Sequence, residues 1–148
     1  MLDAIHHCAI ICSNYQVTKH FYTQILGLTV IAEHYRAERD SYKLDLALPD
    51  GSQIELFSFA HPPTRSTSPE ACGLRHLAFS VCDLDQVIAY LQRHDISCES
   101  VRVDPYTQKR FTFFKDPDDL PLELYEVRSA QPLQSRLFKE SSAINHSV

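Results

Sequence analysis

The sequence predicts an α+β fold made of two tandem βαβββ modules. Two observations predict it: short β-branched runs around one amphipathic helix occur twice in the 148 residues, and the second copy repeats the register of the first. A chain of this length can form one compact domain, or two half-size modules that share a core. Its 44% hydrophobic and 10% aromatic content is sufficient for a packed interior.

The first half of the chain contains one complete set of elements. A β-branched run at 5–12 predicts a strand, and Ser13 or Asn14 can cap a helix over 15–26, where apolar side chains recur at helical spacing. Gly27 ends this helix. Three more strands are predicted after it, at 28–36, 41–48 and 52–59.

The second half repeats this order after a linker. Residues 61–73 are rich in Pro, Ser and Thr and close on a glycine, which is typical of an exposed connection. Asp83 then caps a helix over 84–94, and the tail over 128–148 is expected to be a loosely attached extension with one helical turn. Strands are predicted at 74–81, 96–103, 109–114 and 120–127. We therefore expect a single domain over 4–127, with modules at about 4–60 and 74–127.

The register of the two halves supports an internal repeat. In each half the helix cap lies seven residues after a strand histidine, His7 or His76. Glu55 follows the first histidine by 48 residues and Glu123 follows the second by 47, in the similar sequences QIELF and PLELY. A duplicated supersecondary unit explains these coincidences better than chance does. Each module has one sheet face to bury, so the modules must pair, within one chain or across a dimer.

Four side chains at equivalent positions are candidate metal ligands. Glu55 lies between two apolar residues of a strand, so it faces away from the helix-packed core, and the same holds for Glu123. His7 and His76 occupy equivalent positions on the first strand of each module, so all four side chains can converge in a pseudo-twofold arrangement. Two imidazoles and two carboxylates suit Zn, Ni or Co, with Mn or Fe as further options, and leave positions for water or substrate.

The other histidines and the cysteines are not predicted as ligands. His6 points to the opposite face from His7, and the match of IHHCAI to LRHLAF selects His7. The remaining histidines fall on helices, at a strand end, in the linker and in the tail: His20, His94, His34, His61 and His146. Five scattered cysteines without a CxxC pair indicate free thiols of a reducing compartment, and four of the five are expected in apolar surroundings. The five are Cys8, Cys12, Cys72, Cys82 and Cys98.

Composition excludes several classes of partner. A net charge of -5 and a pI near 5.9 argue against nucleic acid or an anionic membrane, because both select a concentrated basic face. The N-terminus lacks the basic start and apolar run of a signal peptide, and no apolar stretch approaches the ~20 residues of a membrane helix. We expect a cytoplasmic protein that acts on a small molecule.

Several segments resemble a known family. IHHCAI, FYTQILGL, IELFSF, GLRHLAFSV and DPDDLPLELYE are similar to the vicinal oxygen chelate (VOC) superfamily, the glyoxalase I / bleomycin resistance / dioxygenase group. Within it, EACGLRHLAFSV and RVDPYTQKRFTFF most resemble the YaeR-type glyoxalase-like metalloproteins. The resemblance covers 4–127 and implies a U-shaped mixed sheet around one divalent metal ion bound by His7, Glu55, His76 and Glu123. Because dimeric members complete the site between two subunits, it also implies a homodimer.

The resemblance implies a reaction as well. Glyoxalase I-like (lactoylglutathione lyase-like) lyases and isomerases use the metal as a Lewis acid toward a substrate that chelates it through two oxygens, and proceed through an enediolate. Glu55 and Glu123 are the candidate general bases, and pseudo-symmetry leaves the choice open. Glutathione dependence is questionable, because bacterial relatives have an Arg and an Asn where this chain has the apolar Ile11 and Ala60. A glutathione carboxylate would lose its charge-assisted partners there.

Two alternatives remain open. An extradiol-type dioxygenase would bind Fe(II) with two His and one carboxylate, an arrangement that a fourth ligand, Glu55, would crowd. A non-catalytic drug- or metabolite-binding protein is the other alternative, although drug-binding relatives commonly lack the metal ligands.

Two departures concern the second half. Lys109 and Arg110 beside Tyr106 could bind an anionic group, but basic residues on an exposed strand edge are the simpler interpretation. Asp119 stands where family members usually have Gly, which predicts local strain in a left-handed turn without loss of the fold.

Overall fold

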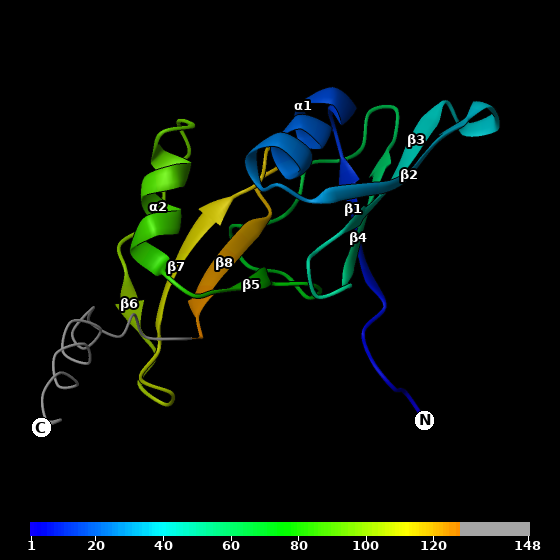
Figure 1. Cartoon of the computed structure of the whole chain (residues 1–148). Helices are drawn as coiled ribbons and strands as arrows, with labels where there is room; N and C mark the ends of the chain where they lie inside the picture. Colours follow the sequence, from blue (N-terminus) through cyan, green and yellow to red (C-terminus); the bar gives the residue numbers. More distant parts are fainter. Residues whose placement is uncertain (128–148) are drawn as a thin grey trace, which may run out of the picture.

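The computed structural model describes residues 1–127 and confirms the α+β fold of two βαβββ modules (Figure 1). The elements of the first module are β1 (His7–Cys12), α1 (Tyr15–His20), the π-helical η1 (Phe21–Ile25), β2 (Thr29–Arg36), the 3-10 turn η2 (Ala37–Arg39), β3 (Ser41–Ala47) and β4 (Gln53–Ser58). Those of the second are β5 (Leu77–Val81), α2 (Leu84–Gln92), β6 (Arg102–Val103), β7 (Arg110–Lys115) and β8 (Pro121–Glu126). The predicted tail extension lies outside the described residues.

Each module forms a four-stranded mixed sheet with the same topology. The strand orders are β1-β4-β3-β2 and β5-β8-β7-β6, with the first strand of each module parallel to the last and the other pairs antiparallel. The registers are also equivalent, because Ala9 lies opposite Glu55 and Ala78 lies opposite Glu123. Since each candidate histidine precedes its alanine by two residues, the internal repeat predicted from spacing is a structural repeat.

Side-chain caps begin both main helices. The Asn14 side chain accepts a hydrogen bond from the Val17 backbone N–H at 3.2 Å, and Asp83 accepts one from the Gln86 N–H at 2.9 Å. The first helix is α-helical only as far as His20. Beyond it the backbone bonding lengthens by one residue, and the Leu26 N–H donates to the Phe21 carbonyl at 2.9 Å.

The strand predicted at 96–103 is largely wrong, because only Arg102–Val103 pairs as a strand. The segment before it approaches β7 through two isolated bonds. The Glu99 N–H donates to the Phe113 carbonyl at 2.8 Å, and the Thr112 hydroxyl donates to the Glu99 carbonyl at 2.7 Å. The Thr112 side chain therefore takes the place that a ladder N–H would hold.

The two modules meet where the first helix of module 1 packs on the β7–β8 turn (Figure 1). The rings of Phe21 and Phe114 lie 6.4 Å apart, and the Tyr22 hydroxyl donates to the buried Asp116 carboxylate at 3.1 Å. The Ser13 backbone N–H donates to Asp118 at 3.0 Å. The modules are thus joined through residues 13–22 of module 1, which contact β7 and the β7–β8 turn.

All five cysteines are free thiols. Cys12 is buried and Cys8 and Cys98 are half-buried, and burial raises the pKa of the Cys12 thiol to about 11. The expectation of four thiols in apolar surroundings is wrong for Cys82, which is exposed because it follows the end of β5 on the way to the cap of α2. Over residues 1–127, no helix has the length and apolarity to span a membrane.

Candidate metal centre

The first His–Glu pair lies on β1 and β4. Ile54 and Leu56 are 2% and 0% exposed, so alternation along β4 turns Glu55 to the opposite face of the sheet. There Nε2 of His7 lies 3.5 Å from Oε2 of Glu55. His6 contacts the His7 ring, Nδ1 to Nδ1 at 2.9 Å. The structure therefore brings His7 to the glutamate, as the match between the two halves predicted.

The second pair reproduces the first, with His76 immediately before β5 and Glu123 on β8. Leu122 and Leu124 are buried, and Glu123 between them faces away from the core with 12% of its side chain exposed. Nε2 of His76 lies 3.0 Å from Oε2 of Glu123. The His76 ring meets the ring of Phe113 edge-on at 5.2 Å, and its Nδ1 is buried without a hydrogen-bond partner in the described structure.

The geometry of each pair fits two ligands of one divalent ion. A metal that binds an imidazole nitrogen and a carboxylate oxygen at ~2.0–2.2 Å holds these two atoms ~3 Å apart. The observed separations are 3.0 Å and 3.5 Å. Within residues 1–127 the His76 ring makes no hydrogen bond to the rest of the fold beyond its contact with Glu123. Nothing in that part of the chain therefore competes with an ion for this ring.

A single chain does not bring the two pairs together. Among the described residues, no three His, Cys, Asp or Glu side chains form a group that could hold a metal ion. The structure thus joins His7 to Glu55 and His76 to Glu123, and leaves the two pairs apart.

Glu55 has two charged neighbours that were not among the predicted site residues. Leu44 and Leu46 of β3 are buried, so Lys43 and Asp45 share the ligand face. The Lys43 ammonium donates to Oε1 of Glu55 at 2.9 Å and also to Asp45, and these hydrogen bonds, to Asp45 first, raise the pKa of Lys43. The pattern SYKLDLAL carried this signal, because charged residues alternate with leucines beside the strand of Glu55.

Module 2 has aromatic rings where module 1 has these charges. In the ladders, Asp45 lies opposite Glu55 and Phe113 lies opposite Glu123. Two residues earlier, Phe111 occupies the place of Lys43. The two His–Glu pairs are therefore similar in backbone geometry and different in electrostatic surroundings.

The other predicted positions are placed as follows. Ile11 is 56% exposed and shares the face of His7, because the two are four residues apart on one strand. Arg110 is bound to Asp85 through both terminal nitrogens, at 3.0 Å and 2.6 Å, and Lys109 reaches the Val127 carbonyl at 3.4 Å. Arg110 is therefore already engaged by a carboxylate.

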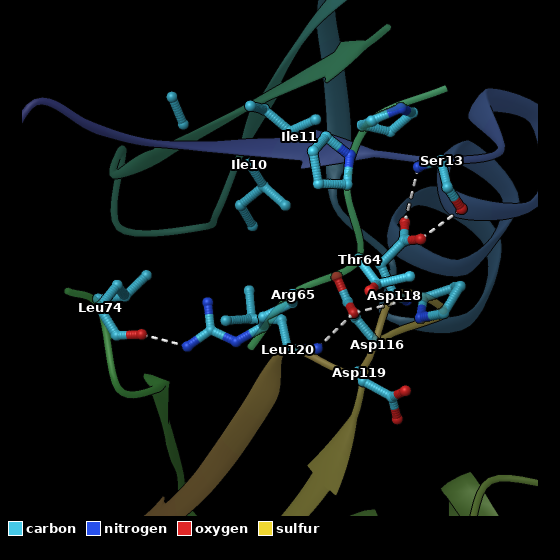
Figure 2. A pocket seen from close by; sticks show the side chains of 14 residues that line it. Ile10, Ile11, Ser13, Thr64, Arg65, Leu74, Asp116, Asp118, Asp119 and Leu120 are labelled. Carbon is cyan, nitrogen blue, oxygen red and sulfur yellow. Dashed lines mark hydrogen bonds between the residues drawn. The ribbon is translucent and has the colours of Figure 1, made fainter. Parts of the chain in front are cut away.

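A pocket of about 520 Å³ lies elsewhere, between β1, the linker and the β7–β8 turn (Figure 2). Its lining contains none of the four candidate ligands. The carboxylate of Asp116 is used internally, since it accepts the backbone N–H groups of Asp118 and Leu120, both at 2.9 Å. Arg65 donates to the Leu74 carbonyl across the pocket, as Figure 2 shows. This pocket therefore lies at the junction between the two modules.

Comparison with known proteins identifies the family. Residues 4–124 match the family described as the Glyoxalase/Bleomycin resistance protein/Dioxygenase superfamily. The chain is 62% identical over 125 residues to the uncharacterized protein YaeR of Escherichia coli (strain K12), which covers 84% of this chain and 97% of YaeR. It is 60% identical over 126 residues to the uncharacterized protein YwkD of Bacillus subtilis (strain 168), covering 85% and 98%.

A solved structure agrees with this assignment. The glyoxalase family protein from Enterococcus faecalis is 50% identical, with a TM-score of 0.78 over 83% of this chain and 97% of that one. The chain belongs to the glyoxalase/bleomycin resistance/dioxygenase superfamily, and the resemblance seen in the sequence motifs is confirmed.

Proposed function

We propose that this superfamily member is a homodimeric, metal-dependent lyase or isomerase of the glyoxalase I type. One divalent ion would be bound by His7 and Glu55 of one subunit and by His76 and Glu123 of the other. The observation that carries the proposal is the pair of matched His–Glu contacts, at 3.5 Å and 3.0 Å, which one chain leaves apart. Two copies related by a twofold axis would form two complete sites from these halves.

The residues of the chain have distinct tasks in this site. The bound ion would act as a Lewis acid toward two neighbouring oxygens of a small substrate. The imidazoles of His7 and His76 are neutral ligands, whereas the carboxylates of Glu55 and Glu123 balance the charge of the ion. One of these carboxylates would move a proton between adjacent carbons of the substrate, a task suited to a half-buried carboxylate beside the reacting atoms.

The surroundings of His7 favour a substrate other than a glutathione adduct. Ile11 presents an exposed apolar side chain on the ligand face, and Ala60 follows the end of β4. Neither offers a partner to a carboxylate. We expect turnover of methylglyoxal with a thiol that lacks the glutathione carboxylates, and weak or no turnover with glutathione. Thioester absorbance during titration with several thiols measures this directly.

Metal retention in two variants tests the ligand set. We expect the wild-type protein to bind one divalent ion per chain, and Glu55→Gln and Glu123→Gln each to weaken binding by more than the ~10–100-fold typical of losing an outer-shell partner. Elemental analysis of protein purified without added metal and chelator competition provide the measurement. Glu33→Gln is the control, because Glu33 pairs with Lys19 of α1 and should keep full metal.

The possible outcomes separate the competing functions. If both glutamine variants keep full metal, the four-ligand site is wrong. Oxygen consumption with catechols by the Fe(II)-loaded protein would point to a dioxygenase. Tight binding of a small molecule without any turnover would point to a binding protein.

A further inference from the structure

We propose that Lys43 is a positioning residue that holds Glu55 as a fixed ligand and thereby makes the two glutamates of the site unequal. This inference rests on the proposed metal site and deepens it. Its basis is an asymmetry between modules whose backbone registers are equivalent.

The two oxygens of Glu55 have different partners. Oε1 accepts a hydrogen bond from the Lys43 ammonium at 2.9 Å, while Oε2 lies 3.5 Å from Nε2 of His7. One oxygen is therefore held by the protein and the other is directed toward the ion. The side chains of Lys43 and Glu55 are 27% and 15% exposed, so solvent screens this contact less than it screens a surface ion pair.

The ammonium is itself held in place. Asp45 accepts a second hydrogen bond from Lys43, and the Phe57 ring lies 5.7 Å from the nitrogen. Buried Leu44 and Leu46 anchor the strand on which Lys43 and Asp45 stand. Lys43 therefore reaches Glu55 from a fixed strand and can hold the orientation of a carboxylate that binds a metal.

Among residues 1–127, Glu123 has no such donor. Its carboxylate makes one contact with a basic side chain, that of His76, and Phe113 occupies the ladder position that Asp45 holds opposite Glu55. The charge-assisted hydrogen bond from Lys43 therefore restrains Glu55 and not Glu123. This difference makes the two glutamates unequal as ligands.

Binding of Zn²⁺ alone by the full-length protein tests the role of Lys43. We expect Lys43→Met to raise the Kd for Zn²⁺ about 10–100-fold in chelator competition, and Lys43→Arg to recover most of the loss because arginine also donates to a carboxylate. Lys19→Met is the matched control. Lys19 forms a similar pair with Glu33 at 2.6 Å, is 30% exposed, and contacts no candidate ligand, so its loss should leave the Kd unchanged.

A double-mutant cycle identifies the group through which Lys43 acts. Lys43→Met should weaken Zn²⁺ binding by the same factor in wild type and in Glu123→Gln, and should add no further loss in Glu55→Gln. The d–d spectrum of the Co²⁺-loaded protein should change with Lys43→Met and not with Lys19→Met. Melting temperatures establish that each variant is folded, and Lys43→Gln replaces Lys43→Met in the cycle if the latter is not.

The outcomes distinguish a failure of the proposed role of Lys43 from a failure of the proposed metal site. An unchanged Kd in Lys43→Met, or an equal loss in the Glu55→Gln background, overturns the role of Lys43. If Glu55→Gln and Glu123→Gln both bind Zn²⁺ as wild type does, the proposed metal site itself fails.

Discussion

Asp116 is a buried carboxyl group at the junction of the two modules. It is 5% exposed, and it accepts hydrogen bonds from the Tyr22 hydroxyl and from the backbone N–H groups of Asp118 and Leu120. Burial raises its pKa above the ordinary value of 3.8, against the opposing effect of these hydrogen bonds. A carboxyl whose pKa is raised by folding favours the folded state most at low pH. Its contribution to stability is lost as pH rises through the folded-state pKa.

Replacing this carboxyl by an amide tests that sign. Asp116→Asn keeps an acceptor for both backbone N–H groups and cannot ionise. We expect its free energy of unfolding, relative to wild type, to increase between about pH 4 and pH 7 in urea denaturation. Asp50→Asn is the control of opposite sign, because hydrogen bonds from Ser52 lower the pKa of Asp50. If the difference in free energy of unfolding between Asp116→Asn and wild type does not change with pH, burial does not control the pKa of Asp116.

The proximity of each histidine to its glutamate could be predicted from residue types and their spacing along the chain. Strand alternation fixes the face of Glu55, and equal spacing places His7 beside it, so residue types and register suffice. The same alternation places Lys43 on the face of Glu55. Its strand carries no candidate ligand, so Lys43 was not among the predicted site residues. Spacing left open whether the pairs meet within one chain or across a dimer, and only the family resemblance implied a site shared between subunits. Their separation depends on side-chain contacts between modules, such as Tyr22 with Asp116, that no periodicity encodes.

At the scale of elements, the sequence predicted helix starts and most strands and missed local changes of hydrogen bonding. Capping residues and apolar spacing define where α1 and α2 begin. The π-helical turn η1 and the short β6 depend on individual bonds, such as that of Thr112 to the Glu99 carbonyl. The turn between β7 and β8 has the left-handed conformation expected at Asp119, with φ of 64°.

Strain in that turn is measurable. Asp119→Gly removes the side chain that disfavours positive φ, and we expect it to raise the free energy of unfolding by a few tenths to about 1 kcal/mol. The ion pair with Lys115 that is lost is 61% and 67% exposed and contributes little. Asp119→Ala separates the two effects, since alanine loses the charge and keeps the Cβ that disfavours positive φ. If Asp119→Gly is no more stable than Asp119→Ala in urea denaturation, backbone strain is excluded.

At the scale of the whole molecule, the two His–Glu pairs of residues 1–127 do not come together in one group of candidate ligands. The modules are tied instead through α1, η1 and the β7–β8 turn (Figure 1). The proposed dimer would bring the two kinds of pair together across its interface. In a symmetric dimer, the first module of each subunit would meet the second module of the other.

Mixed dimers test this arrangement. One chain carries His7→Ala with Glu55→Gln, and the other carries His76→Ala with Glu123→Gln. Neither homodimer should bind metal, whereas the purified heterodimer should bind one ion per two chains, because one of its two shared sites combines intact halves. A heterodimer without metal, formed from folded chains, would place the complete site within single subunits.

In the proposed dimer, the separation of the two His–Glu pairs would also make metal affinity depend on protein concentration. If an ion is bound only where two chains meet, association and metal binding are thermodynamically linked, and each tightens the other by the same factor. Dilution would then release metal without any chelator, and a chelator would dissociate the dimer. The protein would report the supply of its metal through its own state of assembly.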